Sequence, residues 1–127
     1  LIAAILPNLP TTKIDSSGIS RDKKIVESYN NDPLVYRGGT LARTGSEIIN
    51  GTKYINKNMK HIISPILILH GTLDRLADPN GSSILYNGIM SEDKKIKLYE
   101  NYYHEILNEP DKDKVMHDIL DWITKRS

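Results

Sequence analysis

The pattern of hydrophobic and polar positions is clearest in the second half of the chain. A continuous apolar run at 66–69 is typical of a strand buried on both faces of a parallel sheet. Apolar residues at helical spacing predict a helix over 79–89, and alternation at 95–99 predicts a second, more exposed strand. Because a strand–helix–strand segment of this length forms a right-handed crossover, we expect 61–104 to be a βαβ unit. An amphipathic helix over 111–126 completes the predicted elements.

The first half of the chain has a less regular pattern. It begins with an apolar segment at 1–6 and passes through a turn region rich in proline and serine at 7–20. A first helix is predicted over 21–30, with Ser20 as its N-cap and an Asn-Asn-Asp-Pro stop signal after it. Apolar residues at helix-like spacing predict a second helix from 44 to about 59.

Composition narrows the classes of function. The 17 Lys and Arg residues nearly balance the 16 Asp and Glu residues and are scattered, so we predict no nucleic-acid partner. Cysteine is absent and the four histidines are widely separated, so we predict neither a metal nor another cofactor. No apolar run is long enough to span a bilayer, and we expect a cytoplasmic protein.

The two predicted strands each lead into a loop that carries a titratable residue. Asp74 follows the first strand and His104 follows the second. Loops at the carboxyl ends of parallel strands are where an α/β sheet exposes functional groups. An Asp followed by a His is also the order of acid and base in a Ser–Asp–His relay on such a sheet. We therefore predict Asp74 as the acid that orients an imidazole and His104 as the general base.

Other titratable residues fit these roles less well. Asp78 is a rival acid, but it is better placed as the N-cap of a helix that begins at Pro79. A lone histidine in a loop is more often a surface or hydrogen-bonding residue, and we interpret His61, His70 and His117 in that way.

The nucleophile of such a relay is not found in the sequence, because no Gly-x-Ser-x-Gly motif occurs. A sheet of two strands also leaves the apolar run at 66–69 without a neighbour on one side. The chain begins with Leu1 rather than Met. We therefore expect it to be the C-terminal part of a longer protein, in which an N-terminal half carries the nucleophile.

Several segments, in order along nearly the whole chain, resemble one family of hydrolases. They are Leu6–Leu9, Ile14–Ser17, Ser20–Lys23, Tyr29–Leu34, Gly71–Asp78, Lys97–Glu100 and Tyr103–His104. The chain is similar to monoglyceride lipase and the lysophospholipase-like serine hydrolases of the α/β-hydrolase superfamily. The resemblance implies an α/β fold in which 1–60 is a cap or lid segment with its link back to the core. Residues 61–127 would be the C-terminal core, the last βαβα of the sheet.

The resemblance also implies roles for individual residues. It assigns Asp74 as catalytic acid and His104 as general base. It places four substrate-binding residues in the cap region that shapes the acyl tunnel and glycerol pocket of the family: Val26, Tyr29, Ile48 and Ile49. Glu105 departs from the family, in which an apolar residue is expected after the catalytic histidine, and an acid there would alter the preference of the pocket.

The function implied by the resemblance is that of a serine carboxyl-ester hydrolase. It would cleave monoacylglycerols or similar small lipid esters to a fatty acid and an alcohol. A lipid substrate is compatible with peripheral membrane contact through the cap, although no segment has a clear membrane-binding signature; the oligomeric state is not predicted. Two alternatives stay open. One is a truncated, catalytically inactive remnant or interaction module, and the other is the same fold acting on lysophospholipids, other esters or peptides.

Overall fold

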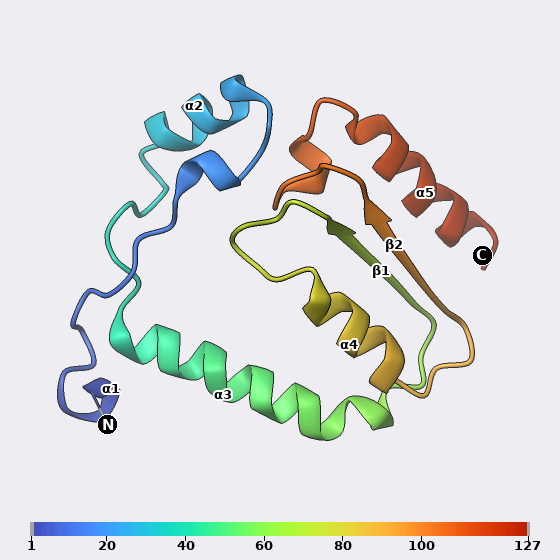
Figure 1. The fold of residues 1–127 in the computed structure, drawn as a ribbon, viewed down its shortest axis with the longest axis horizontal. Helices are drawn as coiled ribbons and strands as arrows, with labels where there is room; N and C mark the ends of the chain where they lie inside the picture. Colours follow the sequence, from blue (N-terminus) through green and yellow to red (C-terminus); the bar gives the residue numbers. More distant parts are fainter. Residues whose placement is uncertain (1, 127) are drawn as a thin grey trace.

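The computed structural model describes residues 2–126, so the terminal Leu1 and Ser127 lie outside the described residues. The helices and strands are α1 (Ile2–Ile5), α2 (Lys23–Asn31), α3 (Ala42–Asn58), β1 (Ile66–Gly71), α4 (Asn80–Gly88), β2 (Lys94–Tyr99) and α5 (Lys112–Thr124) (Figure 1). Short 3-10 helices lie at Ser16–Gly18, Met59–His61 and Ile106–Asn108.

The predicted βαβ unit is confirmed. Strands β1 and β2 are parallel, with Ile66 opposite Lys94 and Gly71 opposite Tyr99, and α4 connects them. Helices α4 and α5 lie on either side of the strands (Figure 1). Because neighbouring strand residues point to opposite faces, Leu69 packs toward α5 whereas the next residue along the strand packs toward α4.

The core is small and lies between the strands and α5. Tyr99, Tyr102 and Val115 are buried together, and the half-buried Leu69, Ile106 and Ile119 pack against them. The rings of Tyr99 and Tyr102 are stacked, with their centroids 5.2 Å apart, a geometry that aromatic pairs favour. The amphipathic pattern of the last predicted helix therefore identified part of the face that packs on the sheet, since Val115 and Ile119 lie in the core whereas Ile123 is exposed.

The helix predicted over 21–30 begins two residues later than expected. Helix α2 begins at Lys23, and its N-cap is Asp22, whose carboxylate accepts the backbone N–H of Lys24. Ser20 does not cap the helix, because its hydroxyl donates to the carbonyl of Asn108 at 2.8 Å and accepts the backbone N–H of Asp22. A contact with a distant part of the chain has therefore replaced the local one.

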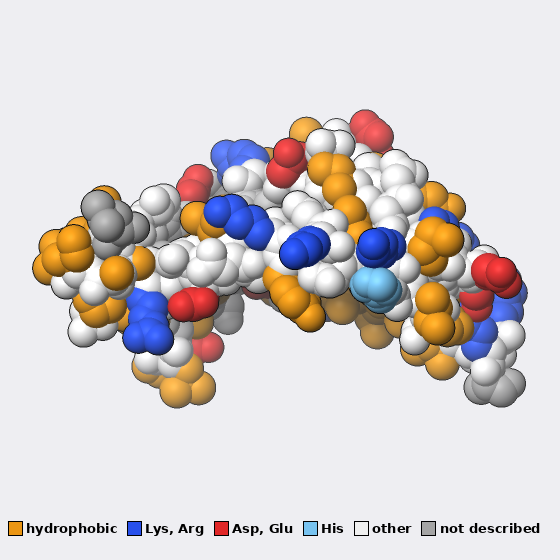
Figure 2. Space-filling view, turned by 90° about the horizontal axis from the view of Figure 1, so that it is seen from below, with side chains coloured by type: hydrophobic (Ala, Val, Ile, Leu, Met, Phe, Trp, Pro, Cys, Tyr) orange, Lys and Arg blue, Asp and Glu red, His pale blue; other side chains and the backbone are white. Residues whose placement is uncertain are grey.

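Apart from residues 16–22, which pack against the loop after β2, the first half of the chain extends away from this core. Residues 2–58 form an arc in Figure 1, with α3 as its longest element, and no residue of α3 is buried. The accessible surface is 9054 Å², whereas a compact protein of this mass exposes about 6,800 Å². Apolar side chains gather at the end of the molecule that carries α1 (Figure 2), where Ile2 and Ile5 are exposed. In the part of the chain that the structure describes, no helix has the length and hydropathy that crossing a bilayer requires.

Candidate active site at the ends of the two strands

The loop that carries Asp74 is fixed by backbone hydrogen bonds to the neighbouring strand end. The N–H of Thr72 donates to the carbonyl of Tyr99, and the N–H of Leu73 donates to the carbonyl of Tyr102, both at 2.9 Å. Gly71 lies so close to this second loop that a Cβ atom would fall within contact distance of the carbonyl oxygen of Tyr102. A glycine at the end of β1 therefore allows the two functional loops to touch.

The carboxylate of Asp74 is nearly completely buried, with 1 % of its side chain exposed. Oδ1 accepts the backbone N–H groups of Leu76 at 2.8 Å and Ala77 at 3.0 Å. Oδ2 lies 2.8 Å from Nδ1 of His104. Burial has the largest single effect on the pKa of Asp74 and raises it, but the hydrogen bonds from Ala77, His104 and Leu76 outweigh burial. The pKa is lowered overall, so this buried carboxyl group is ionised at neutral pH.

The imidazole of His104 is held at one nitrogen and open at the other. Nδ1 faces the ionised carboxylate of Asp74 and donates to it, so the neutral ring carries a lone pair on Nε2. Among the described residues, Nε2 makes no hydrogen bond, and 43 % of the side chain is exposed. A buried carboxylate on one nitrogen and a free lone pair on the other is the arrangement of a general base.

The backbone around His104 is held by residues from the first half of the chain. The N–H of His104 donates to the carbonyl of Gly18 at 3.3 Å, and the N–H of Glu105 donates to the carbonyl of Ile19 at 2.8 Å. The N–H of Tyr103 donates to a carboxylate oxygen of Glu109 at 2.9 Å. Three consecutive backbone N–H groups are thus satisfied by tertiary contacts, which fixes the direction in which the imidazole projects.

Glu109 is a buried carboxylate that the sequence prediction missed. Its side chain has no exposed surface, and it accepts Nε of Arg21 at 2.6 Å and the backbone N–H of Arg21 at 3.2 Å. The hydrogen bond that the guanidinium donates to Glu109 is the largest influence on the pKa of Arg21 and raises it. The guanidinium also lies over the ring of Tyr102 at 4.7 Å. Because the two partners are 88 residues apart, no local pattern could have indicated the pair.

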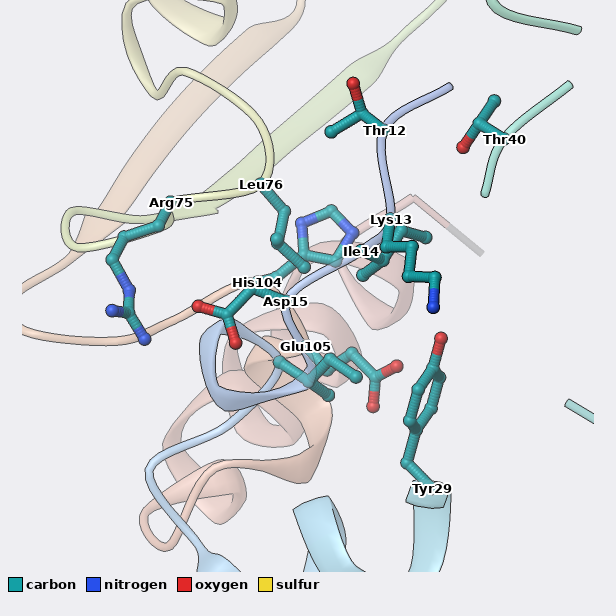
Figure 3. A pocket seen from close by; sticks show the side chains of 11 residues that line it. Thr12, Lys13, Ile14, Asp15, Tyr29, Thr40, Arg75, Leu76, His104 and Glu105 are labelled. Carbon is teal, nitrogen blue, oxygen red and sulfur yellow. The ribbon is translucent and has the colours of Figure 1, made fainter. Parts of the chain in front are cut away.

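His104 opens into a cavity of about 520 Å³. Its wall comes from the loop after β1, the loop after β2 and the first half of the chain (Figure 3). Apolar side chains alternate with hydroxyls and charged groups, and the lining residues are Thr12, Lys13, Ile14, Asp15, Ile19, Tyr29, Thr40, Arg75, Leu76, His104 and Glu105. The carboxylate of Glu105 points toward the same region as the hydroxyl of Tyr29 (Figure 3).

The structure brings some of the predicted site residues together and separates others. Tyr29 lines the same cavity as His104, and Asp74 lies directly behind that histidine. Val26 lines a different hollow of about 300 Å³, beside Tyr103. Ile48 and Ile49 are exposed by 62 % and 57 % on α3 and do not line the cavity of His104. The substrate-binding roles of all four stay predictions.

His70 and Asp78, two rivals considered from the sequence, differ in their surroundings. The carboxylate of Asp78 accepts the backbone N–H of Asn80 at 2.9 Å, as expected of a residue at a helix start, although α4 begins at Asn80 rather than Pro79. His70 is a hydrogen-bonding residue, as interpreted from the sequence, and one of its partners is Asp74, whose Oδ2 lies 2.9 Å from Nε2. Within residues 2–126 no group of three or more His, Asp or Glu side chains is placed to hold a metal ion.

Comparison with known proteins identifies the family of the chain. Residues 1–111 match the model of the hydrolase family described as serine aminopeptidase, S33. The chain is 36 % identical to monoglyceride lipase of Mus musculus over 99 % of its own length and 42 % of that protein. It is 32 % identical to monoacylglycerol lipase of Mycolicibacterium smegmatis over 97 % of its length and 44 % of that protein.

Solved structures give the same result for the fold. The monoacylglycerol lipase of Paleococcus ferrophilus superposes with a TM-score of 0.91 at 28 % identity, covering 99 % of this chain and 49 % of that one. A soluble variant of monoglyceride lipase from Saccharomyces cerevisiae, in complex with a substrate analogue, superposes with a TM-score of 0.85 at 29 % identity, over 99 % and 47 % of the two chains. The chain thus spans less than half the length of these relatives, and its fold is part of an α/β-hydrolase. With a match over residues 1–111, the chain belongs to the serine aminopeptidase S33 family of hydrolases.

Proposed function

We propose that this chain supplies the catalytic acid and general base of a serine carboxyl-ester hydrolase that acts on monoacylglycerols or similar lipid esters. The observation that carries the proposal is the hydrogen bond of 2.8 Å between buried Asp74 and His104, whose other nitrogen is open to a cavity. The names of the relatives, monoglyceride and monoacylglycerol lipases, support the substrate class. The division into a cap at 1–60 and a core at 61–127, and a cytoplasmic location, belong to the same proposal.

The proposed reaction needs a serine from outside these residues, since they contain no Gly-x-Ser-x-Gly elbow. Nε2 of His104 takes the proton of that hydroxyl as its oxygen attacks the ester carbonyl. When the tetrahedral intermediate collapses, His104 gives the proton to the departing alcohol, and the acyl group stays on the serine. Water then attacks the acyl-enzyme, with its proton going first to His104 and then back to the serine oxygen, and the fatty acid is released. Asp74 stays ionised throughout and stabilises the imidazolium.

The cavity beside His104 fits an ester with one apolar and one polar arm. Ile14, Ile19 and Leu76 offer apolar surface, on which each buried methylene contributes about 0.8 kcal/mol. The hydroxyls of Tyr29 and two threonines offer hydrogen bonds to an alcohol such as glycerol. The charged side chains of the lining balance, two cationic and two anionic, which suits a neutral head group: Lys13, Arg75, Asp15 and Glu105. The exposed apolar side chains of α1 suit peripheral contact with the membrane that supplies such a substrate.

The test is activity-based labelling of the natively expressed protein with a fluorophosphonate probe, read out by intact mass, together with hydrolysis of monooleoylglycerol. We expect a labelled species heavier than this chain, and we expect Asp74→Asn and His104→Ala to abolish hydrolysis in a folded protein. His117→Ala is the matched control, because that histidine is exposed on α5 and should leave turnover unchanged. Near-normal turnover in either site variant would refute the assignment. An unlabelled species with the mass of this chain would instead favour an inactive remnant or an interaction module.

A further inference from the structure

His70 is a partly buried imidazole that the proposed reaction does not use. It stands near the end of β1, and its ring is held by three groups. Nε2 lies 2.9 Å from Oδ2 of Asp74 and 3.2 Å from the carbonyl oxygen of Ala77. Nδ1 lies 2.7 Å from the hydroxyl of Ser82 in the first turn of α4. Contacts from the loop after β1 and from the first turn of α4 therefore fix the orientation of the ring.

The same contacts decide which nitrogen of His70 carries the proton. Nε2 faces a carboxylate and a carbonyl oxygen, neither of which has a proton to donate, so Nε2 must be the donor. In the neutral ring Nδ1 is then an acceptor, and the hydroxyl of Ser82 donates to it. Ser82 thus stabilises the tautomer that points an N–H group at Asp74.

We propose that His70 is a positioning residue that holds the carboxylate of Asp74 in the orientation required by His104. This inference rests on the proposed function of Asp74 and His104. Oδ2 of Asp74 receives both imidazoles, at 2.8 Å and 2.9 Å, while Oδ1 receives two backbone N–H groups. The donors on the two oxygens fix the plane of the carboxylate. Without His70, Oδ2 has one donor left, and the carboxylate is free to tilt away from His104.

His70 also affects the charge that His104 experiences. A donor on Oδ2 stabilises the anion, so it weakens the pull of Asp74 on the Nδ1 proton of His104. Removing that donor strengthens the pull of Asp74 on this proton and makes the imidazolium of His104 more stable. Ser82, which faces His70 from α4, is neutral. The charged side chains that share the cavity with His104 stay in place in all variants: Lys13, Asp15, Arg75 and Glu105.

The experiment compares His70→Gln with His70→Asn in the full-length protein. The side-chain amide of Gln reaches the position of Nε2 and can still donate to Asp74, whereas the amide of Asn reaches only the position of Nδ1 and can contact Ser82 alone. We expect His70→Asn to lower kcat about tenfold with little change in KM, as expected for the loss of one hydrogen bond to a charged group. We also expect the acidic limb of the kcat/KM profile to move to higher pH. His70→Gln should restore kcat to within about threefold and return the limb to its original position.

Two outcomes would overturn the inference. One is a kcat and pH profile of His70→Asn equal to those of the unmodified protein. The other is an equal defect in His70→Gln and His70→Asn, which would point to a packing role for the ring. Should His70→Asn fail to fold, as judged by thermal melting, Ser82→Ala takes its place. It removes the group that stabilises the tautomer and should shift the acidic limb in the same direction, and an unmoved limb would also overturn the proposal.

A readout independent of hydrolysis separates this inference from the proposed function. The hydrogen bond between Nδ1 of His104 and Asp74 can be followed by NMR of the labelled imidazole. A stronger hydrogen bond moves the Nδ1 proton resonance downfield, and we expect this shift in His70→Asn and none in His70→Gln. A protein that hydrolyses no ester but shows this shift would disprove the proposed function and uphold the role of His70. If the protein is active and His70→Asn changes neither this shift nor kcat, the proposed function is supported and the role of His70 is disproved.

Discussion

Replacing the buried carboxylate of Glu109 tests how the loop of His104 is held. In Glu109→Ala the guanidinium of Arg21 loses its contact at 2.6 Å, and the backbone N–H groups of Arg21 and Tyr103 lose their acceptor. Breaking a buried ion pair costs about 3–5 kcal/mol of unfolding free energy. We expect the lower end, about 3 kcal/mol, because the Arg21 side chain is 30 % exposed and keeps a contact to Asp111 at 3.5 Å.

Glu109→Gln should lower the unfolding free energy by less than Glu109→Ala, because it keeps one of the two acceptor oxygens. One carboxylate oxygen accepts both backbone N–H groups, and a glutamine oxygen can still do so. The other carboxylate oxygen accepts the N–H of Arg21 Nε. In the glutamine variant an amide nitrogen takes the place of that oxygen, so two donors face each other and this hydrogen bond is lost. The loss of one hydrogen bond between charged groups corresponds to about 1.5–3 kcal/mol.

The assay for both variants is urea unfolding of the full-length protein, followed by tyrosine and tryptophan fluorescence. Asp93→Asn is a matched control, because Asp93 pairs with Arg126 at an exposed position, where an ion pair contributes little. We expect the control to unfold close to the unmodified protein and Glu109→Ala to unfold at clearly lower urea. Equal unfolding midpoints for Glu109→Ala and the control would refute the inference that the ion pair of Glu109 and Arg21 stabilises the loop of His104.

Three further predictions follow from the site. Gly71→Ala should lower the unfolding free energy by about 2–4 kcal/mol, because the new Cβ meets the carbonyl oxygen of Tyr102; an unchanged thermal melt would contradict this. The pKa of Asp74 is lowered in the folded protein, so the stability that its ionisation provides should be fully present above the ordinary carboxylate pKa and be lost as the pH falls through the lowered value. Urea unfolding of the unmodified protein and Asp74→Asn at several pH values should therefore converge in acid, and a constant difference would argue against it. Tyr29→Phe should raise KM for monooleoylglycerol a few-fold with little change in kcat, whereas the exposed Tyr54→Phe should change neither; equal KM values would remove Tyr29 from the pocket.

The elements of the second half could be predicted because each has a local cause. A run of aliphatic residues and an alternating segment identified β1 and β2, and the length between them implied a parallel crossover. Parallel strands end at the same edge of a sheet, so the positions of Asp74 and His104 in the sequence were enough to predict that they meet. The hydrogen bond between them confirms that the two side chains come together.

The supports of the site could not be predicted because their causes are not local. Glu109 and Arg21 are 88 residues apart, and a single Glu before a proline has no pattern of its own. Ser20 looked like a helix cap because its distant partner is invisible in the sequence. His70 stands four positions before Asp74, and this spacing at a strand end was the one available signal that the two side chains could touch.

The backbone hydrogen bonds from His104 and Glu105 to Gly18 and Ile19 also have a mechanical consequence. They join a short part of the first half to the loop of the proposed base, at the wall of the cavity. Displacing this junction would displace the imidazole as well. The position of His104 therefore depends on two backbone carbonyls that lie more than 80 residues earlier in the chain.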